Sequence, residues 1–145
     1  MANVNVNDHK TVSKFMDSVE LVKVVYDFAQ DGGATANELQ LFTAARDLVI
    51  TDFWVRGITE LDSAADGTSI DVGIAGGDED ILLDGVAEAT FAADALVGPT
   101  VVEGAPNVLP LPLKLAEDGA IQMKVVDEAL TSGKCEFNFI VTPFK

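Results

Sequence analysis

Residues 48–61 have the sequence LVITDFWVRGITEL, which is the longest β-rich stretch of the chain. β-Branched and aromatic side chains dominate it, and these types fit the pleated surface of a strand. Apolar residues occur at both odd- and even-numbered positions, which lie on opposite faces of a strand. We therefore expect both faces to be covered and the strand to lie centrally in a sheet. Phe53 and Trp54 then lie on opposite faces. Core packing accounts for both, and the alternative for Trp54 is a subunit contact, where tryptophan is enriched.

Shorter strand-like segments surround this stretch. Apolar residues at every second position predict strands, because a period of two places them on one face. Such strands are predicted over residues 19–29, 38–43, 68–74, 113–115, 121–125 and 135–142. Turns of small and polar residues are predicted at 31–33, 44–47, 62–67 and 131–134. The whole pattern predicts an all-β (mainly β) fold, an antiparallel β-sandwich or jelly-roll-like domain.

One short helix is expected within this β framework. Asp78 follows two glycines and suits a helix N-cap, while Glu79 and Asp80 suit the positive end of a helix dipole. We therefore predict a short helix over about residues 79–84, closed by Gly85.

The acidic residues around this predicted helix are also candidate cation ligands. The group comprises Asp71, Asp78, Glu79, Asp80 and Asp84. Hard cations such as Ca²⁺ bind several carboxylate oxygens, and we name Asp71, Asp78 and Asp80 as candidate ligands. The spacing does not match an EF-hand loop. Helix capping and a solvated acidic face form the alternative account, and we expect no other cofactor.

The chain divides into an arm and one domain. Its 145 residues suit a single compact domain, and residues 19–145 carry the whole strand pattern. Residues 1–18 are polar and predict a flexible N-terminal arm. Val4 and Val6 alternate with asparagine in this arm, a weak strand signal. We expect a partner's sheet edge to order the arm by strand addition.

Composition limits the classes of partner. The formal net charge is −15, which repels nucleic-acid backbones and anionic lipid headgroups. A solvated acidic surface is the preferred interpretation, and one acidic face meeting a basic partner is the alternative. No apolar run is long enough to span a bilayer, and the first ten residues lack the apolar region of a signal peptide. We expect synthesis in a cytoplasm, no membrane anchor and no nucleic-acid partner.

The sequence offers few parts for catalysis. His9 is the only histidine and lies in the arm, so nothing is expected to hold it as a catalytic base. Cys135 falls on the apolar parity of the last strand, which predicts a core residue. The glycine-rich segment 73–78 matches no phosphate-binding motif, and acidic residues stand where such a loop needs lysine. We therefore expect that the protein is not an enzyme.

Several segments together resemble a known group of proteins. They are VVYDFA at 24–29, DGG at 31–33, VITDFWV at 49–55, IDVGIAGGD at 70–78, DILL at 80–83, LTSGK at 130–134 and FNFIV at 137–141. In this order they resemble small β-rich virion proteins of tailed bacteriophages, including head decoration (cement) proteins. The resemblance covers roughly residues 19–142.

The resemblance implies a structural role in a virion. Proteins of this group typically form trimers on the capsid surface, with the major capsid protein as partner, and their terminal arms reach across neighbouring capsid subunits. Val4, Val6, His9 and Val12 would then be capsid-contact residues of the arm. Trp54, Val108 and Leu111 would lie at the homotrimer interface. The alternatives are a phage tail or fibre protein, or a carbohydrate-binding β-sandwich module, which predicts an exposed aromatic platform.

Overall fold

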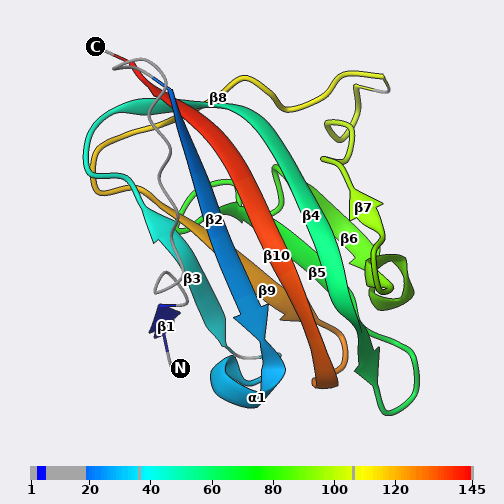
Figure 1. Ribbon diagram of the computed structural model, residues 1–145. Helices are drawn as coiled ribbons and strands as arrows, with labels where there is room; N and C mark the ends of the chain where they lie inside the picture. Colours follow the sequence, from blue (N-terminus) through cyan, green and yellow to red (C-terminus); the bar gives the residue numbers. More distant parts are fainter. Residues whose placement is uncertain (1–2, 6–18, 36, 106, 145) are drawn as a thin grey trace.

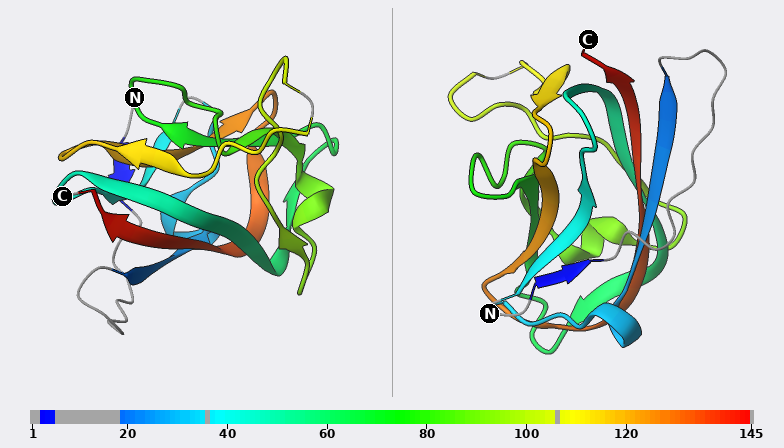
Figure 2. Two further views of the ribbon diagram at one scale, coloured as in Figure 1. Left: turned by 90° about the horizontal axis from the view of Figure 1, so that it is seen from above. Right: turned by 90° about the vertical axis from the view of Figure 1, so that its left-hand side faces the viewer.

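The computed structural model describes residues 3–5, 19–35, 37–105 and 107–144. These residues form two β-sheets that pack face to face (Figures 1 and 2). Sheet A has the order β1 (Asn3–Asn5), β3 (Glu38–Thr43), β9 (Ala120–Val126), β5 (Ser69–Ile74) and β6 (Leu83–Ala87). Sheet B has the order β2 (Glu20–Asp27), β10 (Leu130–Pro143), β4 (Leu48–Ser63) and β7 (Leu96–Val97), and β8 (Leu113–Leu115) also pairs with β4.

All strand pairs are antiparallel except β1 with β3, so the structure confirms the predicted antiparallel sandwich. Two single-turn helical segments accompany the strands: α1 (Phe28–Asp31) after β2, and the 3₁₀ helix η2 (Glu88–Phe91) after β6. Among the described residues, no helix has the length and apolarity needed to cross a membrane.

The core lies between the two sheets. Sheet B contributes Tyr26, Phe53, Phe137 and Phe139, and sheet A contributes Leu39, Phe42, Ile70, Val72, Ile121, Met123 and Val125, all buried. The ring of Phe139 on β10 packs 4.9 Å from that of Phe42 on β3 and 5.1 Å from that of Phe53 on β4, centroid to centroid. Aromatic contacts therefore join the two sheets.

A β-bulge in β4 explains why both parities of residues 48–61 are apolar. Ile50 pairs with Val141 and Asp52 with Ile140, so Thr51 is an extra residue opposite β10. The insertion reverses the parity, because a strand alternates faces at every residue. Ile50 and Phe53 consequently both face the core. The expectation that both faces of β4 are covered is wrong, since Thr51 and Asp52 are exposed.

The predicted helix over 79–84 is wrong, and the short helix is α1 instead. The amide of Leu82 donates to the Val72 carbonyl (2.9 Å), so the backbone follows β5 rather than closing a helical turn. Leu82 and its neighbour Leu83 are both buried, which fixes this path. At α1, the Asp27 carboxylate accepts from the Ala29 amide (3.0 Å) as an N-cap.

The predicted turn at 131–134 is also wrong, because these residues belong to β10. Ser132 pairs with Asp62 and Lys134 with Thr59 across bulges in the ladder. Gly133 has a φ of +124°, which allows the irregular path without strain. The chain reverses earlier, at residues 127–129, where Asp127 adopts a φ of +73°.

Candidate interaction surface

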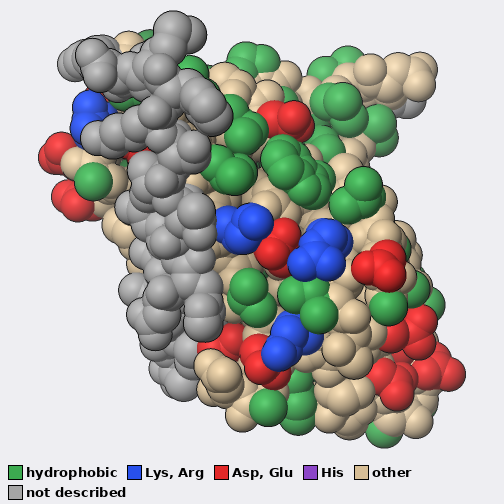
Figure 3. Space-filling model, in the orientation of Figure 1, with side chains coloured by type: hydrophobic (Ala, Val, Ile, Leu, Met, Phe, Trp, Pro, Cys, Tyr) green, Lys and Arg blue, Asp and Glu red, His purple; other side chains and the backbone are tan. Residues whose placement is uncertain are grey.

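The outer face of sheet B is a surface of mixed chemistry. We define it by the outward side chains of β2, β10, β4 and β7. In one row across the strands, Val25 pairs with Glu136, Glu136 with Arg56 and Arg56 with Leu96. A second row places Lys23 beside Asn138 and Asn138 beside Trp54. Figure 3 views the molecule from this side and shows apolar and charged groups interspersed.

Apolar side chains make up much of this outer face. Its half-buried members are Leu21, Val25, Val49, Trp54, Ile58 and Ile140. Leu96 at the edge is 71% exposed. An apolar sheet face of this kind is unusual for an exposed surface and is typical of one that meets a partner. We therefore treat it as the leading candidate interaction surface.

Ion pairs balance the charges on the same face. Glu136 lies at the centre, 3.9 Å from the ammonium of Lys23 and 3.5 Å from Nε of Arg56. Arg56 also approaches Asp94 (4.0 Å), and Lys134 pairs with a carboxylate on β2 (3.2 Å). Three of the six lysines and arginines in the described residues thus lie here, although the chain has a net charge of −15. Paired charges lower the cost of covering such a surface.

The proline-rich loop between β7 and β8 is a second exposed apolar feature. Val101, Val108 and Leu109 are 48–53% exposed. The amide of Val102 donates to the Val108 carbonyl (2.7 Å) and closes the loop on itself. Leu111, in contrast, packs against the core. Of the two interface residues predicted in this loop, Val108 is 50% exposed and Leu111 is half-buried.

The loop leaves sheet B at β7, which pairs with Val55 and Arg56 beside Trp54. Strand β8 pairs with Leu48–Ile50 and brings the loop to one end of sheet B, whereas Trp54 lies farther along β4. Trp54 is half-buried on the outer face and Phe53 is buried, so their predicted placement on opposite faces is confirmed.

The arm is described only at residues 3–5. Val4 pairs in parallel with Leu39 of the same chain, so its strand signal is satisfied within this molecule. Val6, His9 and Val12 lie outside the described residues, and arm contacts with another subunit stay a prediction.

The predicted carboxylate ligands lie near one another but are engaged differently. Asp78, Asp80 and Asp84 line a surface cavity of about 250 Å³ together with Glu103. Asp71 instead accepts from the Gly85 amide (2.7 Å).

Neighbouring carboxylates change the pKa of Asp80 in this cavity. A hydrogen bond with Asp78 raises the pKa of Asp80 to about 6, and partial burial and the charge of Asp84 act in the same direction. Burial likewise raises the pKa of Asp71. Whether Asp71, Asp78 and Asp80 bind a cation stays a prediction.

We expect stability to fall as the pH rises from about 4 to 7 through the Asp80 carboxyl. The pKa of this carboxyl is ordinarily 3.8 and is about 6 in the fold, so the folded state holds more protons in this window. The contribution of the Asp80 carboxyl to the free energy of unfolding is complete below pH 4 and is lost as the pH passes 6. Asp80→Asn removes the titrating group, so the wild-type protein should lose stability relative to this variant over the window. Urea-unfolding midpoints at each pH test this, and a constant difference would contradict it.

Sequence reasoning missed the outer face of sheet B. Leu21 and Val25 on β2 and Ile140 on β10 are apolar at the outward parity of strands whose inward parity is also apolar. Apolar residues on both faces of one strand were the sequence signal for a second apolar surface. Cys135, in contrast, is fully buried as predicted, and burial raises the pKa of its thiol.

Comparison with known proteins identifies a shared fold. No protein-family model matches the chain, and a search of curated proteins gives no match. A chain in the solved structure of the cyanophage Pam1 capsid asymmetric unit is similar, with a TM-score of 0.59 and 16% sequence identity. The similarity covers 92% of this chain and 91% of that chain. The two chains therefore share one sandwich architecture over nearly their whole lengths.

Proposed function

We propose that this chain is a structural protein of a bacteriophage virion, a decoration (cement) protein that binds the outside of the head and stabilises the major capsid lattice. The observation that carries the proposal is the fold shared, over nine tenths of both chains, with a chain of a phage capsid. A ligand that binds only the assembled shell stabilises that shell by mass action.

The outer face of sheet B is the surface we assign to the major capsid protein. It combines a half-buried Trp54, an exposed Leu96 and the paired charges around Glu136. Aromatic and arginine side chains are enriched in interface hot spots, and Arg56 flanks this tryptophan on β4. The exposed apolar loop at Val108 and Leu109 is the surface we assign to homotrimer contacts.

We expect Leu96→Asp to weaken binding to shells by roughly tenfold to a hundredfold, because it places a charge in a desolvated contact. Leu96 is 71% exposed, so the variant keeps its fold. Ala116→Asp is the matched control: it adds the same charge at an exposed turn after β8, which pairs with Leu48–Ile50, whereas Leu96 pairs with Arg56 farther along β4. The measurement mixes each protein with expanded capsids that lack it and records occupancy and shell melting.

The outcomes separate the parts of the proposal. No binding of the wild-type protein to shells would remove the decoration role, and binding to isolated tails instead would indicate a tail component. Equal binding by Leu96→Asp and the control would show that the capsid contact lies on another surface. Leu109→Asp tests the trimer independently: sedimentation should change from trimer to monomer.

A further inference from the structure

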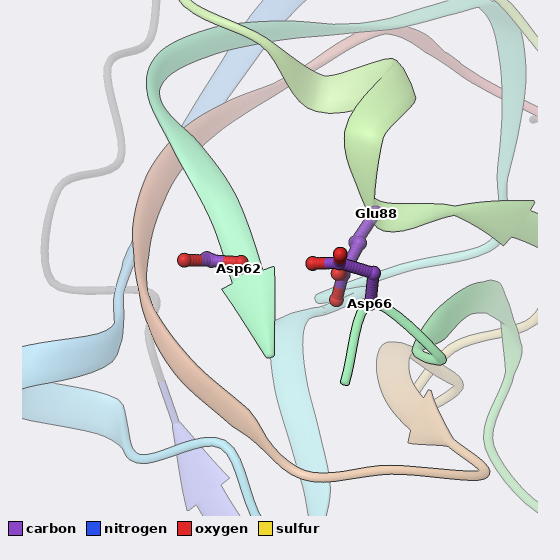
Figure 4. Close-up of side chains that lie close together, drawn as sticks. All are labelled: Asp62, Asp66 and Glu88. Carbon is purple, nitrogen blue, oxygen red and sulfur yellow. The ribbon is translucent and has the colours of Figure 1, made fainter. Parts of the chain in front are cut away.

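Three carboxylates from separate segments converge at one edge of the sandwich. Asp62 is near the end of β4, Asp66 lies in the following turn, and Glu88 begins η2. One oxygen of each lies within 4.8 Å of the others. Figure 4 shows the three side chains directed toward a common point. This group is distinct from the carboxylates that line the cavity at Asp80.

Glu88 is the unusual member of the group. Its side chain is only 4% exposed, and its Oε2 atom has no hydrogen-bond partner among the described residues. Buried carboxylate oxygens are normally paired, because leaving water without a compensating contact is unfavourable. No ion pair in the described part of the chain joins any of the three to lysine or arginine. A cation from solution would supply the missing partner.

Other contacts hold the backbone around the three carboxylates in place. The Glu128 carboxylate accepts from the Ser63 hydroxyl (2.7 Å) and from the Ala65 and Gly67 amides (3.2 and 3.0 Å), so it fixes the turn on both sides of Asp66. The Glu88 amide donates to the Thr68 carbonyl (3.1 Å), which ties η2 to the end of the same turn. The site is thus formed before any ligand arrives.

We propose that Asp62, Asp66 and Glu88 bind one Ca²⁺ ion. The ligands are all carboxylate oxygens, which hard cations prefer, and Ca²⁺–O distances of roughly 2.3–2.6 Å allow ligand oxygens up to about 5 Å apart. Two of the three carboxylates are exposed, so water completes the coordination shell. Ca²⁺ tolerates such an irregular shell better than Mg²⁺, which demands near-ideal octahedral geometry. The bound ion links β4 of sheet B to η2, which follows β6 of sheet A.

The test is thermal unfolding of the EDTA-treated full chain, with CaCl₂ added against NaCl of equal ionic strength. With a Kd on the order of 10⁻⁴–10⁻³ M, 10 mM Ca²⁺ should raise the Tm by about 4–8 °C. Titration calorimetry should show one site per chain that is lost in Glu88→Gln. Glu88→Gln should abolish the shift, because it removes the buried charge while keeping the shape of the side chain.

Two further variants keep the test decisive. Asp66→Asn should also abolish the shift; Asp66 is exposed with a φ of +56°, and asparagine tolerates that conformation, so folding is unaffected. The double variant Asp78→Asn, Asp80→Asn is the matched control and should keep the full shift. No Ca²⁺-specific shift in the wild-type protein would overturn the proposal. So would a shift that survives both Glu88→Gln and Asp66→Asn.

Discussion

Replacing Phe139 by alanine should lower the free energy of unfolding by about 3–5 kcal/mol, the range for deleting a buried phenylalanine. Phe139 is fully buried and packs against Phe42 of the opposite sheet and Phe53 of its own sheet. The truncation opens a cavity between the sheets, which a rigid β framework closes poorly, and it removes two aromatic pairs. Urea unfolding followed by circular dichroism measures the loss.

Phe144→Ala is the matched control for this variant. Phe144 is 47% exposed, and its ring contacts the ammonium of Lys114 (4.1 Å to the centroid). An exposed contact of this kind contributes roughly 0.5–1 kcal/mol. A similar loss in the two variants would contradict the central place assigned to Phe139 in the core.

Gly57→Ala should destabilise the protein by roughly 3 kcal/mol, the upper end for overpacking. A Cβ atom at position 57 would lie 1.9 Å from the carbonyl oxygen of Ala92, so backbone must move. Two hydrogen bonds oppose that movement: the Gly57 amide donates to Ala95, and the Asp94 amide donates to Gly57 (both 2.9 Å). The strain therefore cannot relax without breaking contacts, and chemical denaturation should show it.

The same variant should weaken the Ca²⁺-dependent rise in Tm, because the displaced segment follows η2 and Glu88 directly. Gly98→Ala is the control: a Cβ there meets nothing within 4 Å. Its stability should stay the same or rise slightly, since alanine restricts the unfolded chain. Equal stability of Gly57→Ala and Gly98→Ala would show that the 92–95 segment moves freely.

The sequence predicted the strands well because a period of two is a direct sign of a sheet face. Residues 38–43 and 113–115 have the predicted bounds, and β10 has the predicted buried parity. Two of the errors share one cause: hydrogen bonding to a neighbouring strand overrode the local signal. Asp78 carries a local capping signal, but pairing with β5 holds the 78–82 segment. Gly133 carries a turn signal, but its flexibility serves a bulge.

The candidate surfaces were less accessible to sequence reasoning. The outer face of sheet B depends on which strands are neighbours, and β2 reaches β4 only through β10, which comes last among them in the chain. The carboxylates of Asp62 and Asp66 meet Glu88 only because η2 folds back against β4. Glu88 lies among alanines and shows no local sign of burial. Only the assembled sandwich shows that one of its oxygens lacks a partner.

The position of β10 between β2 and β4 has a consequence for the order in which the protein matures. Both neighbours leave the ribosome long before β10 does, and neither can close sheet B alone. Pairings between segments so distant in sequence form slowly, because the entropy cost of closing a long loop comes before the stabilising contacts form. The rows that carry Glu136 and Asn138 therefore do not exist on a nascent chain. A nascent chain therefore lacks the complete outer face of sheet B until β10 has been made and has paired with β2 and β4.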